Sequence, residues 1–106
     1  MKLEISPECQ IGAHIIEIVW SKKILEIQGA KGGAENLEII VIRLRPDRPI
    51  TAIFQTFIHE LIHQVAFVYH LDIEDETIQV LAAGLAQAFI SLGIEPDFSQ
   101  IPEEKL

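Results

Sequence analysis

The proline-containing segment RPDRP, residues 45–49, divides this chain into two halves that favour different secondary structure. Before it, the segments 11–21, 23–28 and 37–45 are rich in β-branched residues, which predicts strands. The stretch 29–36 contains three glycines and an asparagine, which is typical of a hairpin connection longer than a two-residue turn. Proline cannot donate to a sheet ladder, so the sheet is expected to end at RPDRP.

After Ile50 the apolar residues recur at helical spacing. The first helix carries one apolar stripe, made of Phe54, Phe57, Ile58, Leu61, Val65 and Val68. Asp72 is a plausible N-cap for a second helix over 76–92, and Gly93 is expected as its C′ residue. The expected core stripe of that helix is Ile78, Leu81, Ala82, Leu85 and Phe89. The sequence therefore predicts an α+β fold, a small antiparallel sheet of about three strands followed by a two-helix hairpin.

Composition limits the class of protein. The 106 residues suffice for one domain, predicted over 1–94, with 95–106 as an acidic C-terminal tail. The single cysteine, Cys9, and an N-terminus without an apolar signal region predict a cytoplasmic protein. No apolar run approaches the length that spans a bilayer, so we expect no membrane partner. The net charge of −8 argues against binding to nucleic acid.

The motif HELIH, residues 59–63, is the candidate functional site of the chain. His59 and His63 are one helical turn apart, so their rings project from the same side, away from the apolar stripe. Two imidazoles at this spacing can share one zinc ion. Glu60 lies about 100° around the helix from His59, beside the metal, where a general base must be to take a proton from an activated water.

A catalytic zinc site usually needs a third protein ligand. The acidic cluster DIEDE, residues 72–76, begins the next helix, which a short turn brings back toward His63. Helical geometry favours Glu74 or Asp75 over Glu76 as the ligand, because Glu76 points away from the core side. His70 follows His63 by seven residues, too far to bind the same ion, and is a candidate for oxyanion or substrate contact.

The segment FIHELIHQVAFVYHLDIEDETIQVLAAGLAQAF resembles small zinc metallopeptidase domains of the gluzincin type, the minigluzincins and phage-encoded HExxH proteins. The similarity covers roughly residues 50–92. It implies a minimal zincin-like fold with His59 and His63 as zinc ligands and Glu60 as the base. The LAAGL run places the family's acidic ligand at Asp75, where these families usually have glutamate.

Two functions are consistent with these residues. The first is a zinc-dependent metallopeptidase that hydrolyses peptide or protein substrates through a metal-activated water and Glu60. The second is a metal-binding, zincin-like domain with little or no activity, which binds a partner or is blocked by its own tail through Asp97, Glu103 or Glu104. The sequence predicts neither the substrate nor the oligomeric state.

Overall fold

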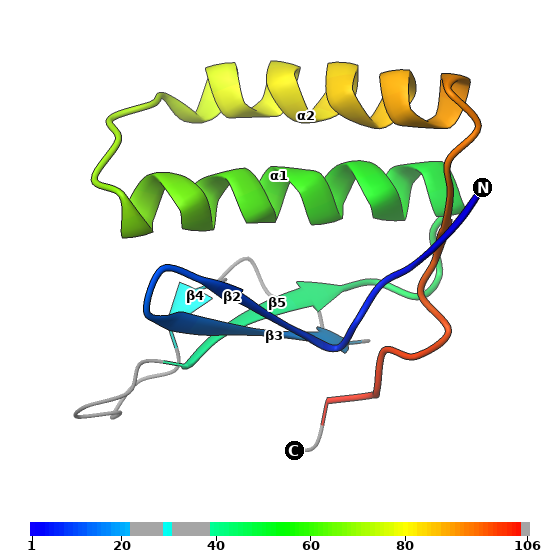
Figure 1. The fold of residues 1–106 in the computed structure, drawn as a ribbon, viewed down its shortest axis with the longest axis horizontal. Helices are drawn as coiled ribbons and strands as arrows, with labels where there is room; N and C mark the ends of the chain where they lie inside the picture. The colour runs from blue at the N-terminus through cyan, green and yellow to red at the C-terminus, as the bar shows by residue number, and fades with distance from the viewer. Residues whose placement is uncertain (22–28, 31–38, 105–106) are drawn as a thin grey trace.

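The computed structural model describes residues 1–21, 29–30 and 39–104. The elements in chain order are β1 (Lys2–Glu4), β2 (Glu8–Ile11), β3 (His14–Trp20), β4 (Gly29–Ala30), β5 (Ile39–Leu44), α1 (Ile50–Val68), α2 (Asp75–Ser91) and β6 (Glu95–Asp97). The larger sheet, α1 and α2 stack as three layers, with α1 in the middle (Figure 1). The predicted α+β class with a helical hairpin is confirmed. The predicted strand 23–28 and most of the predicted connection 29–36 lie outside the described residues.

The larger sheet has the strand order β2-β3-β5-β4. β2 and β3 form an antiparallel hairpin, and β4 is antiparallel to β5. The central pair, β3 and β5, is parallel, with Ile16 opposite Ile40. The sheet is therefore mixed, which corrects the predicted antiparallel sheet. The 18 residues between Trp20 and Ile39 are enough for the crossover that a parallel pair needs.

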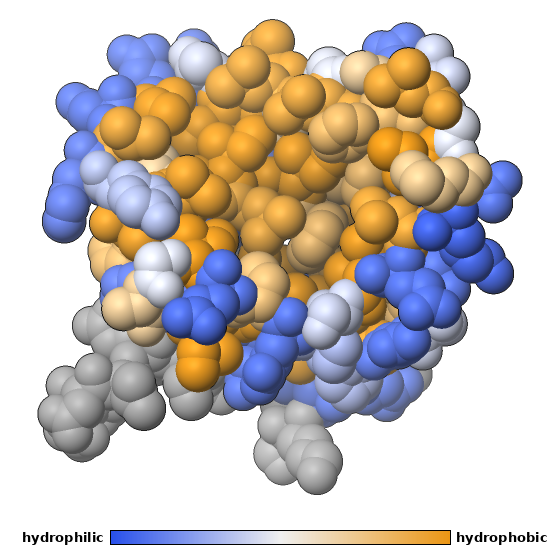
Figure 2. Space-filling view, viewed as in Figure 1, coloured by the Kyte–Doolittle hydropathy of each residue, from blue (hydrophilic) through white to orange (hydrophobic). Residues whose placement is uncertain are grey.

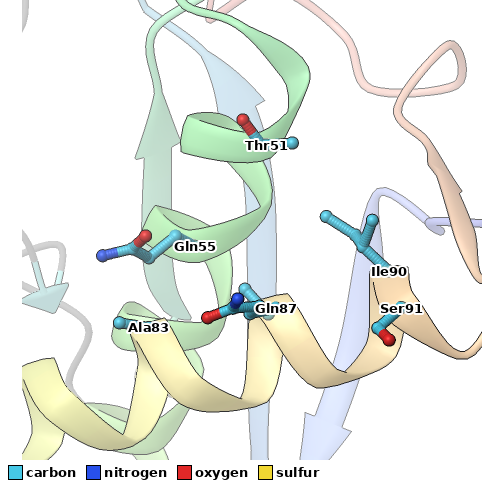
Figure 3. Close-up of a pocket in the computed structure, with 7 residues that line it drawn as sticks. Thr51, Gln55, Ala83, Gln87, Ile90 and Ser91 are labelled. Carbon is cyan, nitrogen blue, oxygen red and sulfur yellow. The ribbon is translucent and has the colours of Figure 1, made fainter.

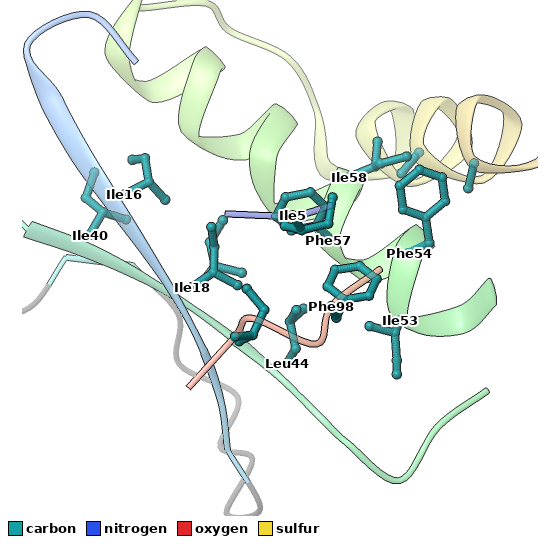
Figure 4. Packing of buried hydrophobic residues seen from close by; sticks show 14 residues of the cluster. Ile5, Ile16, Ile18, Ile40, Leu44, Ile53, Phe54, Phe57, Ile58 and Phe98 are labelled. Carbon is teal, nitrogen blue, oxygen red and sulfur yellow. The ribbon is translucent and has the colours of Figure 1, made fainter. Parts of the chain in front are cut away.

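The core lies between the sheet and α1 (Figure 4). Side chains alternate between the two faces of a strand, so every second residue of β3 and β5 points to one face. The buried residues of these two strands at alternate positions are Ile16, Ile18, Ile40, Ile42 and Leu44. α1 contributes Phe57, whose ring packs edge-on against Phe98 with centroids 5.7 Å apart. This packing fixes α1 against the sheet.

The C-terminal segment is part of this fold. β6 pairs in parallel with β1, and Phe98 and Ile101 are buried in the core. Beyond them, the amide of Trp20 donates to the carbonyl of Pro102, and the amide of Glu104 donates to the carbonyl of Trp20, each at 2.9 Å. The segment predicted as an acidic tail therefore packs on the domain, because its apolar residues Phe98 and Ile101 complete the core. Residues 105–106 lie outside the described part.

Both helices end in the same backbone motif. At the end of α2, Gly93 has φ 96°, and the amide of Ile94 donates to the carbonyl of Phe89 at 3.0 Å. This confirms Gly93 as the C′ residue. At the end of α1, His70 takes the equivalent position with φ 60°, and the amide of Leu71 donates to the carbonyl of Ala66 at 2.8 Å.

The second helix differs from its prediction in two details. Its N-cap is Glu74 rather than Asp72, because the chain stays extended until Asp75. Ile78 and Ala82 are buried as expected, whereas Leu81 is 45% and Leu85 40% exposed. The reason is that α2 packs chiefly against α1, so a single narrow face of α2 is covered.

Candidate metal centre

α1 directs two histidine rings to one point. His59 and His63 lie one turn apart on the same face, as helical geometry requires. Their Nε2 atoms are 3.0 Å apart, and their ring centroids are 4.8 Å apart. The two side chains retain 22% and 34% of their exposure, so both rings remain reachable from solvent.

The third donor comes from the first residue of α2. Asp75 Oδ1 lies 2.7 Å from His63 Nε2 and 3.4 Å from His59 Nε2. The connection between the helices reverses the chain, so that α2 starts beside the end of α1 (Figure 1). The Asp75 side chain is 66% exposed, so the group lies at the surface of the helical layer.

The three donor atoms have the spacing of a metal site. They are 2.7, 3.0 and 3.4 Å from one another. Tetrahedral zinc with ligands at about 2.0–2.2 Å places neighbouring ligand atoms roughly 3.3 Å apart. Two imidazoles and one carboxylate, with a position left for water, are also the donor set of many catalytic zinc sites. His59, His63 and Asp75 therefore fit the metal that the sequence predicts.

The alternative acidic ligands lie elsewhere. Glu74 is the extended N-cap residue of α2, and Glu76 is exposed in the first turn of the helix. Within the described ranges, the group of converging donor atoms contains Asp75 and neither of these glutamates. Asp97, Glu103 and Glu104 also lie outside this group. Glu104 instead forms an ion pair with Arg43 at 2.8 Å.

Glu60 lies on the side of α1 that turns toward the sheet. Phe57 and Gln64, three and four residues away on the same side, are buried, and Glu60 is itself half-buried. This burial raises the pKa of the Glu60 carboxyl, while positive charge on His59 and His63 acts in the opposite direction.

The predicted secondary residues lie at the C-terminal end of α1. His70 is exposed and follows the last helical turn, so the helical face assumed for it does not extend to its position. Tyr69, the C-cap residue of α1, is 56% exposed. Neither residue belongs to the converging donor group.

The contact of His14 with the C-terminal end of α1 was not predicted from the sequence. This residue begins β3, and its ring lies 6.0 Å from the ring of Phe67, one helical turn after His63. The β2–β3 turn approaches α1 so closely that a Cβ on Gly12 would lie 2.8 Å from a methyl group of Val68. Glycine at position 12 permits this close approach, because it has no Cβ and its φ is 61°.

A groove runs along the seam between α1 and α2 (Figure 3). Its volume is about 370 Å³. Its lining residue nearest to the candidate metal ligands along α1 is Gln55, one turn before His59. The lining carries small apolar, amide and hydroxyl groups without a charge, and consists of Thr51, Gln55, Ala83, Ala86, Gln87, Ile90 and Ser91.

No protein-family model, curated protein or solved structure matches this chain. The resemblance to gluzincin-type peptidases therefore remains a prediction from the residues around HELIH. Over the part of the chain that the structure describes, no helix is both long and apolar enough to cross a bilayer.

Proposed function

We propose that this protein is a zinc-dependent metallopeptidase whose site is built from HELIH and Asp75. The observation that carries the proposal is the convergence of His59 Nε2, His63 Nε2 and Asp75 Oδ1 within 3.4 Å of one another. Zinc held by these residues would supply the Lewis acidity that polarises a peptide carbonyl and acidifies water.

The protein's own contribution is to position the ligands and to move a proton. The α1 backbone fixes the two imidazoles, and the helical hairpin adds the carboxylate of Asp75. Glu60, next to His59, accepts a proton on its carboxylate from the attacking water and passes it to the leaving amine nitrogen. Its position next to His59, half-buried on α1, supports this role.

The groove beside the site supports a peptide as substrate. A polypeptide backbone offers N–H and C=O groups in alternation, and the side chains of Gln55 and Gln87 can both donate and accept. The absence of charge in the groove lining suits a neutral backbone better than a charged small molecule.

The test begins with metal content. Elemental analysis of protein purified without added metal or chelator should give about one zinc per chain, and a His59→Ala, His63→Ala double variant should contain none. A peptide library incubated with the parent should show zinc-dependent cleavage. Glu60→Gln should keep the zinc and lose the cleavage, because the amide has the same shape but cannot accept the proton. Cleavage that survives in Glu60→Gln contradicts the proposal.

A second candidate is a metal-binding domain that does not turn over. The high exposure of Asp75 favours it, since a water-accessible carboxylate gives little of the enclosure that strengthens electrostatic catalysis. In that case the parent binds zinc through the same three residues, but no peptide in the library is cut by either parent or Glu60→Gln.

A further inference from the structure

Among the described elements, α2 has α1 as its main contact, so much of the surface of α2 is uncovered. α2 packs chiefly on α1, at the opposite side of α1 from the β3 and β5 strands (Figure 1). A broad hydrophobic area covers the helices in the space-filling view (Figure 2). On α2 the exposed apolar residues include Val80, Leu81, Leu85 and Leu92. Exposed area of this kind usually marks an interaction site.

Three exposed residues of α2 and its C-cap residue form a regular stripe along the flank of the helix, next to its buried face. Leu81, Leu85, Ala88 and Leu92 follow one another at spacings of four, three and four, the pattern of a helix–helix seam. Leu81 is 45% exposed, Leu85 40% and Leu92 77%. We refer to these four residues as the leucine stripe. A pattern with this period favours another helix as the occupant over an extended strand.

The charge pattern favours an uncharged helix, such as a second copy of α2, over a charged partner. From Thr77 to Ile94 the chain has no ionisable side chain, although its net charge is −8. The stripe has no carboxylate that could attract a basic partner, and no lysine or arginine that could attract an anionic lipid surface. A copy of the same helix is neutral and apolar in the same places, so the two surfaces meet without repulsion.

We propose that two copies of this chain associate through their α2 helices, packed antiparallel along the leucine stripe. A parallel pair would bring the acidic first turns of both helices, which include Asp75 and Glu76, together at one end. An antiparallel pair separates them by about the helix length of roughly 25 Å, beyond the screening length of about 8 Å at physiological salt. The acidic turns therefore select the antiparallel arrangement.

The stripe also fits its own copy in register. With the two-fold axis between positions 86 and 87, Leu85 faces the partner's Ala88, and Leu81 faces the partner's Leu92. A large residue thus meets a small one at the centre, as helix packing requires. Asp75 lies before the stripe and on another side of α2, so the metal-binding group remains outside the interface. The proposal is therefore independent of the proposed function.

The test is the mass of the full chain in solution, measured by light scattering and sedimentation equilibrium over a dilution series. The parent should be a dimer that dissociates on dilution. Leu85→Glu should raise the dimer dissociation constant by more than about 100-fold, because the buried charge enters the interface twice. Val80→Glu is the matched control, since Val80 is 72% exposed on the same helix but points away from the stripe. It should leave the dimer intact, and both variants should keep the helical circular dichroism of the parent.

Cross-linking tests the register without a destabilising charge. In a Cys9→Ser background, a chain carrying Leu85→Cys and Ala88→Cys should form covalent dimers on mild oxidation, whereas Val80→Cys should not. A parent that is monomeric at every concentration overturns the proposal and leaves the stripe for a helix of another protein. A dimer that persists unchanged in Leu85→Glu, or that cross-links as well through Val80→Cys, overturns it too.

Discussion

α1 and α2 are similar in length, 19 and 17 residues, but they differ in how they are held. α1 lies between the sheet and α2, and its buried residues face both. α2 is held on one side only, by α1. Three of the four proposed site residues belong to the enclosed helix, and only Asp75 belongs to the outer one. The position of the two histidines is therefore set by the core, whereas the position of the Asp75 carboxylate depends on how α2 packs on α1.

The largest expected effect is on zinc binding, and it should be unequal between the helices. His63→Ala should weaken zinc binding about a thousandfold, roughly the loss of one ligand among those that give about 10–16 kcal/mol in structural sites. Asp75→Asn keeps an oxygen donor on a helix that can shift. The loss of zinc affinity in this variant should therefore be at least tenfold smaller than in His63→Ala. Competition with a chromophoric chelator measures both, with Glu76→Gln as the neutral control. Equal losses in His63→Ala and Asp75→Asn would show that the two helices hold the metal alike.

The free energy of unfolding should also depend more on residues of α1 than on the exposed residues of α2. Phe57→Ala empties a core position beside Phe98 and should cost about 3–5 kcal/mol of unfolding free energy. Val80→Ala, on the exposed side of α2, should change it by no more than about 0.5 kcal/mol. Urea unfolding at one protein concentration gives both values. If Val80→Ala were as damaging as Phe57→Ala, the outer side of α2 would have to be covered within the monomer.

The helix ends offer a sharper comparison, because the same motif uses glycine in one place and histidine in the other. Gly93→Ala should cost roughly 1–2 kcal/mol, since a Cβ disfavours the left-handed backbone at φ 96°. His70→Gly should stabilise the protein by roughly 1 kcal/mol for the same reason, at φ 60°. Thermal unfolding measures both changes. His70→Ala, which keeps the Cβ, should lack the gain, and a gain in that variant would assign the effect to the imidazole instead.

The smallest effect concerns pH and the pairing of the C-terminal segment. The amide of Ser99 donates to the Asp97 carboxylate at 2.9 Å, and this hydrogen bond holds the pKa of Asp97 below its usual value. A lowered pKa adds stability above the unfolded-state pKa of about 4, and that stability disappears as the pH falls through the folded value. The parent should therefore melt slightly higher than Asp97→Asn near neutral pH, and the difference should shrink in acid. A difference that is the same at every pH would contradict this account.

The sequence predicted best what a single helix determines. The four-residue spacing of His59 and His63 fixes a shared face once the helix forms, and the short turn fixes the return of α2 toward them. Helical geometry left both Glu74 and Asp75 open as the third ligand, and it was the resemblance through the LAAGL run that pointed to Asp75, whose carboxylate lies beside the histidines. Local geometry alone was sufficient for the two histidines.

Relations between distant segments could not be predicted in the same way. The residues of β3 and β5 favour strands, but an apolar strand pattern is the same in both directions, so the parallel pairing was missed. The acidic residues of the C-terminal segment suggested a tail, so the burial of Phe98 and Ile101 in the core was not predicted. Leu81 and Leu85 look like core residues in sequence, since periodicity shows an apolar face without showing which molecule covers it.

The pairing of β1 with β6 has a consequence for the order of unfolding. Lys2 lies opposite Glu95, 93 positions further along the chain, and the amides of Glu95 and Ile5 donate across the junction at 2.7 and 2.9 Å. Such distant partners meet late in folding, because the intervening chain must first be ordered. Once formed, they tie the strands next to the N-terminus to the far end of the helical layer. Because the contacts that form last open first, we expect the amide protons of Ile5 and Glu95 to exchange with solvent by local opening, faster than those of the core strands β3 and β5.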